Sequence, residues 1–196
     1  YDEAIAAGRN PNYLISQGLW PDHIIEVKPT DPTSGDIVWE WHVWDHLIQD
    51  YDASKVNYGV VGDHPELVDI NYPESSQQDW LHTNSIAYNE QLAQILISVH
   101  NFDEIWVIDH STTTQQAAGH VGGRYGRGGD LLYRWGNPAT YQRGGSSDHK
   151  LFGQHDATWI KSGLPGAGHI LIFNNGYNRI GTKYSSVDEI VPPVGG

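Results

Sequence analysis

Residues 152–159 read Phe152-Gly153-Gln154-His155-Asp156-Ala157-Thr158-Trp159 and place a histidine beside a carboxylate, between a glycine and a tryptophan. A glycine-rich turn separates this stretch from the strand-like run His169–Phe173. An earlier stretch, Asp79–Ser85 (DWLHTNS), has the same layout and precedes the run Ile95–Ser98. Two polar, histidine-bearing segments that each precede a hydrophobic strand predict repeated units that bring their histidines to a shared place.

Strand patterns dominate the rest of the chain, and helix patterns are nearly missing. Alternating, β-branched or aromatic residues predict strands over 23–27, 37–41, 95–99, 104–109, 129–136, 170–173 and 186–191. The first two of these strands, joined by a Pro/Asp/Gly turn, predict a hairpin. Helix is expected only as one turn over 2–7 and a short segment over 65–70, within the long polar stretch 42–78.

The strand units resemble one another in order, which indicates the fold class. Gly129-Asp130 opens a strand that repeats the pattern begun at Gly35-Asp36, and each histidine segment precedes an Ile-Leu-Ile strand. Self-similar four-stranded units with irregular insertions predict an all-β fold, a β-propeller. We expect residues 1–196 to form two to three blades of a single propeller domain that is incomplete at both ends. The chain begins at Tyr1 without an initiator methionine, which is expected of a processed product or a fragment.

The composition excludes several classes of partner. The formal net charge of −13 argues against nucleic-acid and anionic-membrane binding, because phosphate contacts need a basic surface. No stretch approaches the roughly 20 apolar residues needed to span a membrane. The absence of cysteine rules out a disulfide, a thiolate nucleophile and a cysteine metal site.

A basic stretch interrupts the acidic chain just before His155. Residues 124–150 carry five basic residues against two acidic ones. This stretch is either a solvated loop or a rim that attracts a small anionic substrate.

Three histidines could instead be metal ligands. His23, His46 and His64 each lie beside an aspartate and could share a metal with it. Their spacing matches no established metal motif, so surface polarity is the favoured interpretation, and no metal or cofactor is predicted.

The ordered motifs resemble the arylsulfate sulfotransferases over most of residues 12–191. The segments that carry the likeness are Asp79–Ile86, Ile95–Ser98, Glu104–Asp109, Gly153–Asp156 and Tyr184–Ile190. The resemblance implies a six-bladed, exported propeller, periplasmic or extracellular. It also implies a transferase that moves a sulfuryl group from a phenolic sulfate to a phenol acceptor, without a nucleotide donor, through a sulfurylated histidine.

The resemblance also assigns roles to individual residues. His155 would be the nucleophile, and His82 with Asn84 would bind and polarise the sulfuryl oxygens. His100 stands where the family commonly has an arginine, whose fixed fork of donors suits an oxyanion better. The family's His-His-Asp segment has no counterpart in this chain.

The residues themselves suit sulfuryl transfer, although each has a structural alternative. A neutral imidazole can carry a transferred group and release it, and histidine and amide donors can stabilise the oxygens that gain charge. His82 and Asn84 could instead cap turns, and Asp156 could orient a neighbouring histidine. Four tryptophans at strand positions are expected to pack in the core: Trp39, Trp41, Trp106 and Trp135. Core packing is also favoured for Trp159, although it is the tryptophan most expected near a phenolic ligand.

The second hypothesis is a catalytically inactive propeller that serves as a scaffold or binding module. The histidine at position 100 favours it. In either case we expect self-association, or association with the remaining part of a propeller.

Overall fold

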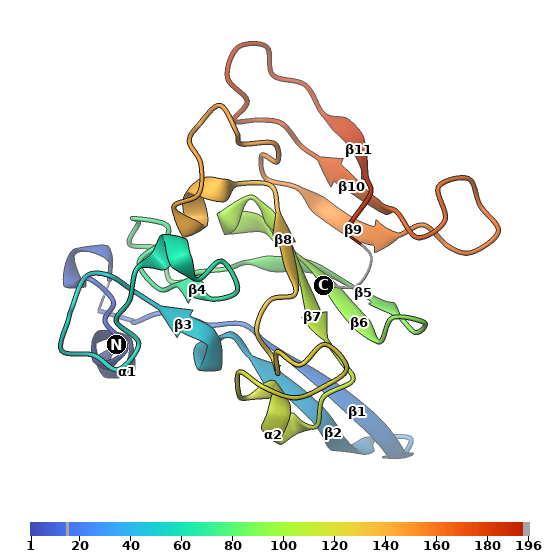
Figure 1. Cartoon of the computed structure of the whole chain (residues 1–196), viewed down its shortest axis with the longest axis horizontal. Coiled ribbons are helices and arrows are strands. Elements are labelled where there is room, and N and C mark those ends of the chain that lie inside the picture. Colours follow the sequence, from blue (N-terminus) through green and yellow to red (C-terminus); the bar gives the residue numbers. More distant parts are fainter. Residues whose placement is uncertain (15, 194–196) are drawn as a thin grey trace.

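The computed structural model describes residues 1–14 and 16–193. Strands and connecting loops make up most of this part of the chain (Figure 1). Its helices and strands are α1 (Asp2–Ala6), β1 (His23–Asp31), β2 (Ser34–His42), β3 (Leu47–Ile48), β4 (Val68–Asp69), β5 (Thr83–Asn89), β6 (Gln94–Val99), β7 (Glu104–Asp109), α2 (Thr114–Ala117), β8 (Tyr133–Trp135), β9 (His155–Trp159), β10 (Ile170–Asn174) and β11 (Ser186–Ile190). Short 3₁₀ turns lie at Pro11–Tyr13, Val43–His46, Val61–Asp63, His100–Phe102 and Pro138–Tyr141.

The largest sheet is an antiparallel meander in the order β5-β6-β7-β8. Every residue of β6 and β7 is buried, which explains why both read as continuous apolar runs in the sequence. In β5 the exposed residues alternate with partly buried ones, as expected of a strand with one solvated face. β8 is shorter than the predicted strand over 129–136, because only Tyr133–Trp135 pairs with β7.

A second sheet has the order β11-β10-β9 and packs beside the first through β9 and β5. The Ser85 hydroxyl accepts a hydrogen bond from the backbone amide of Ala157 at 3.0 Å. The buried side-chain amide of Gln154 donates to the carbonyls of Val99 and Glu104 at 3.1 and 2.8 Å. These bonds fix the start of β9 against the ends of β6 and β7.

The N-terminal region contributes a hairpin and one small parallel pair. β1 and β2 pair as the predicted hairpin and extend beyond the predicted bounds. β3 and β4 form a two-residue parallel bridge. The predicted helix over 65–70 is wrong, because a turn at residues 65–66 and strand β4 occupy that segment. Val68 pairs with Leu47 of β3 and lies in the core instead of on a helical face.

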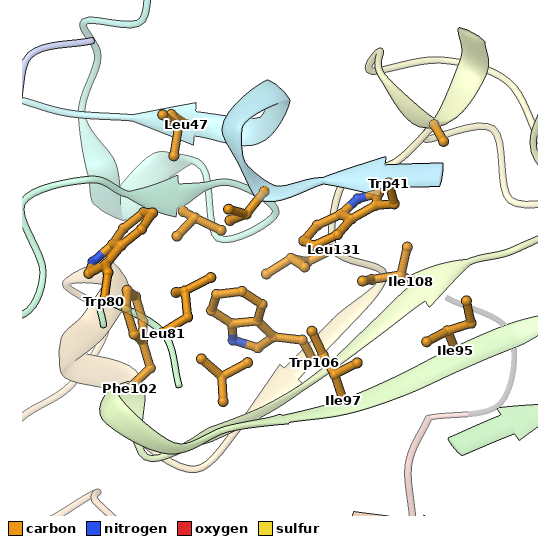
Figure 2. Packing of buried hydrophobic residues seen from close by; sticks show 14 of the residues in the cluster. Trp41, Leu47, Trp80, Leu81, Ile95, Ile97, Phe102, Trp106, Ile108 and Leu131 are labelled. Atoms are coloured by element: carbon orange, nitrogen blue, oxygen red, sulfur yellow. The ribbon is translucent and has the colours of Figure 1, made fainter. Parts of the chain in front are cut away.

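Large aromatic side chains fill the main core, between the four-stranded sheet and the N-terminal region (Figure 2). Trp106 of β7 packs its ring edge-on against Phe102, and Phe102 packs against Trp80, at centroid distances of 5.4 and 5.7 Å. Trp41 of β2 is 1 % exposed in the same cluster. The predicted packing role is confirmed for Trp39, Trp41 and Trp106 in this cluster, and Trp135 is partly buried against the second hydrophobic cluster.

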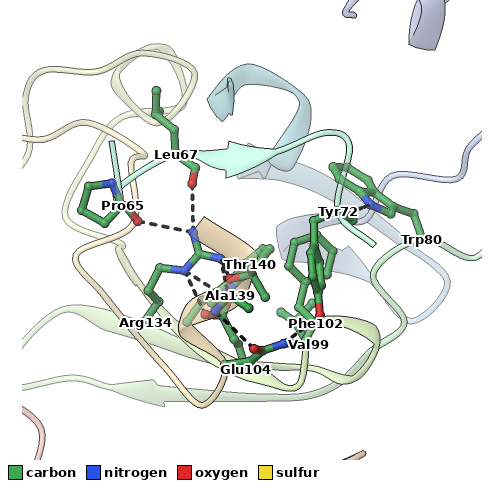
Figure 3. Close-up of polar contacts among 12 residues, drawn as sticks. Pro65, Leu67, Tyr72, Trp80, Val99, Phe102, Glu104, Arg134, Ala139 and Thr140 are labelled. Atoms are coloured by element: carbon green, nitrogen blue, oxygen red, sulfur yellow. Dashed lines mark hydrogen bonds and ion pairs between the residues drawn. The ribbon is translucent and has the colours of Figure 1, made fainter. Parts of the chain in front are cut away.

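A buried ion pair joins β7 to β8 (Figure 3). The Arg134 guanidinium donates to both carboxylate oxygens of Glu104 and to the Thr140 hydroxyl. It also donates to the Leu67 carbonyl at 2.9 Å. Burial raises the pKa of Glu104, and Arg134 opposes that shift. This cation of the basic stretch is therefore structural.

The predicted all-β class is confirmed, and the described residues form four small sheets, of which three are antiparallel. None of the sheets closes on itself within residues 1–14 and 16–193. The propeller, its number of blades and its incompleteness at both ends stay predictions. Among the described residues, no helix has the length and apolar character needed to cross a membrane.

Candidate functional site

Three of the predicted site residues form one row of imidazole rings. The ring of His100 lies 5.1 Å from that of His82 and 5.4 Å from that of His155, between centroids, and both contacts are edge-on. His82 immediately precedes β5, His100 follows β6, and His155 begins β9. The corner where the two sheets meet therefore gathers histidines that are up to 73 residues apart in the sequence.

His82 is paired with a carboxylate that the sequence did not mark. Its Nδ1 lies 2.5 Å from Oδ2 of Asp79, and both side chains are about half exposed. Since a carboxylate only accepts, Nδ1 carries the proton and Nε2 is left free for proton exchange. His82 adopts a left-handed backbone with φ of 52°, which turns the chain immediately before β5.

His100 occupies the centre of the row, and both of its ring nitrogens are engaged. Nδ1 lies 2.9 Å from the Asn101 side-chain oxygen, and Nε2 lies 3.0 Å from the Tyr177 hydroxyl. Burial, and then the nearby charge of Asp103, raise the pKa of Tyr177. The phenol is thus a proton donor to Nε2, and Nδ1–H donates to Asn101. A neutral His100 ring can therefore make both hydrogen bonds, donating from Nδ1 to Asn101 and accepting at Nε2 from Tyr177.

His155 faces two groups through the same nitrogen. Nδ1 lies 3.2 Å from the Gly153 carbonyl and 2.8 Å from the side-chain nitrogen of Asn175. A proton on Nδ1 would donate to Gly153 and leave the Nε2 lone pair free. In the other tautomer, Nδ1 is unprotonated and accepts a hydrogen bond from Asn175, and the ring proton is on Nε2. Only the first tautomer makes Nε2 a nucleophile.

Gly153 is needed at the turn that presents His155. Its φ is +64°, and a Cβ there would lie 2.1 Å from the Tyr177 ring. The backbone amide of Gly153 donates to Asp103 Oδ1 at 2.5 Å. The close approach of Tyr177 to this backbone is possible only with glycine.

Asn84 lies at the same corner, but its amide is committed to the protein. Its side-chain nitrogen donates to the Gln154 carbonyl at 2.8 Å. The side-chain oxygen is buried and has no hydrogen-bond partner among the described residues. Asn84 thus joins β5 to the start of β9, one residue before His155.

Asp156, the neighbour of His155, is exposed and has a left-handed φ of 52°. Within the described part of the chain it forms no hydrogen bond to a histidine. Trp159 is 8 % exposed and belongs to the second hydrophobic cluster, so it packs in the core and does not face a ligand.

A groove of about 760 Å³ opens beside His82. The hairpin β1–β2 forms one wall and β5 with β6 the other, and the backbone amide of Thr83 donates to Asp22 across it at 2.9 Å. Its apolar lining comes from Pro21, Ile24, Ile25, Trp41, Leu81, Ile86 and Ile97. Polar residues, among them Asp22, His23 and Asn84, complete the lining, and the volume and the apolar side chains suit an aromatic ring.

The sequence reasoning missed Asp79, Asn175 and Tyr177. Of these three, Asn175 could have been predicted from the internal repeat. It directly follows β10, as His100 directly follows β6. Each sheet thus contributes one residue at the start of its first strand and one after its second. Tyr177 had no such signal, because only the fold brings it to His100.

The basic stretch and the histidines considered as metal ligands contribute no residue to this row. Arg124 and Arg143 of the basic stretch donate to the backbone carbonyls of Gln91 and Gly62. Of the three histidines considered as metal ligands, His64 bonds Glu66 and is exposed. The surface interpretation is wrong for His46, which is completely buried and contacts Asp130 instead of its neighbour Asp45.

The comparisons with known proteins agree with the motif resemblance. A search of curated proteins gave no match. The family model described as Arylsulfotransferase (ASST) matches residues 9–189, which include every histidine of the row and the residues bonded to them. The chain belongs to the arylsulfotransferase family.

Proposed function

We propose that this chain transfers a sulfuryl group from a phenolic sulfate ester to a phenol, with His155 as the covalent carrier. The observation that carries the proposal is the row His82–His100–His155 in a chain of the arylsulfotransferase family. A row of imidazoles, of which His82 lines a partly apolar groove, supplies a nucleophile, proton carriers and space for an aromatic ring.

In the first half of the reaction, Nε2 of His155 attacks sulfur while Nδ1–H donates to the Gly153 carbonyl. The N–S bond forms as the S–O bond to the donor phenol breaks, and the phenolate leaves with the bonding electrons. His82 enters this step as the imidazolium, whose Nδ1–H is held by Asp79; it gives its Nε2 proton to that oxygen and becomes neutral.

In the second half, the acceptor phenol loses its proton to His82 and its oxygen attacks sulfur. The N–S bond breaks, and the electron pair returns to the neutral ring of His155. The Asn84 amide has a second N–H besides the one it donates to Gln154, and this second N–H is the nearby neutral donor for the sulfuryl oxygens, in a chain where His100 stands where the family commonly has an arginine. No nucleotide takes part in this scheme.

The test is sulfuryl transfer from p-nitrophenyl sulfate to phenol, followed as nitrophenol release. We expect His155→Ala to abolish release and His169→Ala to leave it unchanged, because His169 pairs with Glu189 at the start of β10, the end opposite to Asn175. Acid-quenched wild type, incubated with donor alone, should carry a sulfuryl group on His155 by mass spectrometry. If the wild type releases no nitrophenol, or His155→Ala releases as much, the proposal fails and the scaffold hypothesis replaces it.

A further inference from the structure

A second histidine cluster lies apart from the row and takes no part in the proposed transfer. It consists of His46, at the end of the 3₁₀ turn after β2, His120 in the loop after α2, and Asp130 before β8. One nitrogen from each ring and one carboxylate oxygen all lie within 4.8 Å of one another. Nδ1 of His46 and Nδ1 of His120 each lie 2.8 Å from Oδ1 of Asp130.

The hydrogen bonds of His46 leave a lone pair facing a carboxylate. Its Nε2 lies 2.9 Å from the Ala117 carbonyl, which can only accept, so Nε2 carries a proton. In the neutral ring Nδ1 is then unprotonated, yet it points at Asp130 Oδ1, another acceptor. Two acceptors at 2.8 Å repel each other unless a positive charge lies between them. His46 has no exposed surface, so that charge is shielded from water.

The surroundings hold His46 in this orientation. The indole of Trp41 stacks on its ring with an interplanar angle of 5° and donates to the Gly129 carbonyl at 2.7 Å. A Cβ on Gly129 would lie 2.6 Å from Nε2 of His46 and 2.0 Å from the Ala117 oxygen. Only glycine lets this backbone approach the ring so closely. An imidazole fixed by Nε2–H to a carbonyl, with Nδ1 free, is the usual arrangement of a metal-bound histidine.

We propose that His46, His120 and Asp130 bind a divalent transition-metal ion, with Zn²⁺ as the best match. Two imidazoles and one carboxylate are ligands that zinc accepts, with metal–ligand distances of about 2.0–2.2 Å. Ligand atoms of a tetrahedral zinc ion lie about 3.3 Å apart, so the two 2.8 Å contacts open by about 0.5 Å on binding. The −13 charge of the chain favours a cation.

The fourth position of the ion faces solvent on the side of His120, whose side chain is 60 % exposed. His120 also lines a groove of about 450 Å³ together with Asp45 and His64. Water can therefore complete the coordination. The three ligands come from segments 74 and 10 residues apart, so the bound ion would tie the glycine-rich loop after α2 to the end of the β1–β2 hairpin.

The experiment is a titration of chelator-treated, dialysed protein with Zn²⁺ by calorimetry, with thermal unfolding recorded in parallel. Wild type should bind one ion per chain and melt at a higher temperature with Zn²⁺ than without it. His120→Ala removes an exposed ligand and leaves the buried packing intact. It should weaken binding by more than about tenfold, since even the loss of a residue that only supports a ligand costs 10–100-fold.

Two control variants separate this cluster from the other histidines. His169→Ala removes a partly exposed histidine from a different carboxylate pair, and His155→Ala removes the nucleophile of the proposed transfer site. Both should bind Zn²⁺ as the wild type does. The proposal is overturned if the wild type does not bind, if His120→Ala binds equally well, or if His155→Ala alone abolishes binding. A wild type that does not bind would mean that His46 and Asp130 form a charged pair.

Discussion

At the scale of single residues, the carboxylate behind His82 has a defined chemical task in the proposed reaction. Asp79 holds the Nδ1 proton of His82 and stabilises the ring when Nε2 takes up a second proton. Asp79 therefore acts through His82 as a positioning residue.

We expect Asp79→Asn to lower kcat by about 10²-fold or more, the contribution typical of general acid–base catalysis. The loss should be larger with phenyl sulfate than with p-nitrophenyl sulfate, because nitrophenolate leaves without a proton. The measurement is kcat and KM for both donors. An equal loss for both would show that Asp79 supports only the local structure.

The glycine before Gln154 and His155 gives a second prediction. Gly153→Ala introduces a methyl group 2.1 Å from the Tyr177 ring and strains a backbone with φ of +64°. We expect the transfer rate to fall at least tenfold, because Tyr177 leaves His100 and the turn that carries His155 shifts. Such small displacements of reacting groups cost up to about 10²-fold.

Gly145→Ala is the matched control for that substitution, since open space surrounds its Cβ position. Gly153→Ala combined with Tyr177→Ala should recover part of the lost rate by removing the clash. A Gly153→Ala protein with wild-type transfer kinetics would show that the Tyr177 contact is irrelevant.

At the scale of elements, the ion pair Glu104–Arg134 connects β7 to β8, and both of its side chains are buried (Figure 3). We expect Arg134→Met to destabilise the fold by about 3–5 kcal/mol, since it leaves a buried carboxylate unpaired. Urea unfolding monitored by tryptophan fluorescence measures the change, because Trp106 donates to the same carboxylate at 2.7 Å.

Arg143→Met is the control, because Arg143 is half exposed and its carboxylate contact is 3.8 Å long. Its loss of stability should be much smaller. The double change Arg134→Met with Glu104→Leu should be more stable than Arg134→Met alone. An Arg134→Met protein as stable as the control variant would contradict the structural role of the pair.

At the scale of the whole molecule, a buried carboxylate makes the stability of the fold depend on pH. Desolvation raises the pKa of Asp69 from 3.8 to about 6, against the hydrogen bond from Asn71. The folded protein then holds this proton more tightly than the unfolded chain. The stabilising contribution is complete below about pH 4 and is lost as the pH rises through about 6.

We expect Asp69→Asn to be more stable than the wild type at pH 7, by about 3 kcal/mol for a shift of about two pKa units. The difference should vanish near pH 4. Asparagine keeps an oxygen for the Asn71 amide, so the substitution isolates the charge. The free energy of unfolding of both proteins at several pH values tests this, and parallel pH profiles would contradict the assignment.

Local patterns were sufficient for much of the fold. Continuous apolar runs marked β6 and β7, and a Pro/Asp/Gly turn marked the hairpin of β1 and β2. The same patterns failed at 65–70, where the pairing of β4 with β3 overrode local preference. They also missed β5 and β9 as strands, because both carry polar residues at the corner where the sheets meet.

Sequence patterns were enough to identify the family, the all-β class and the equivalent placement of His82 and His155, because strand patterns and motifs are local. The groups that surround those histidines could be identified only from the packing of the fold. Tyr177 meets His100 across 77 residues, and Asp130 meets His46 across 84. Such contacts depend on how whole sheets and loops pack, and the spacing of residues along a strand carries no information about them.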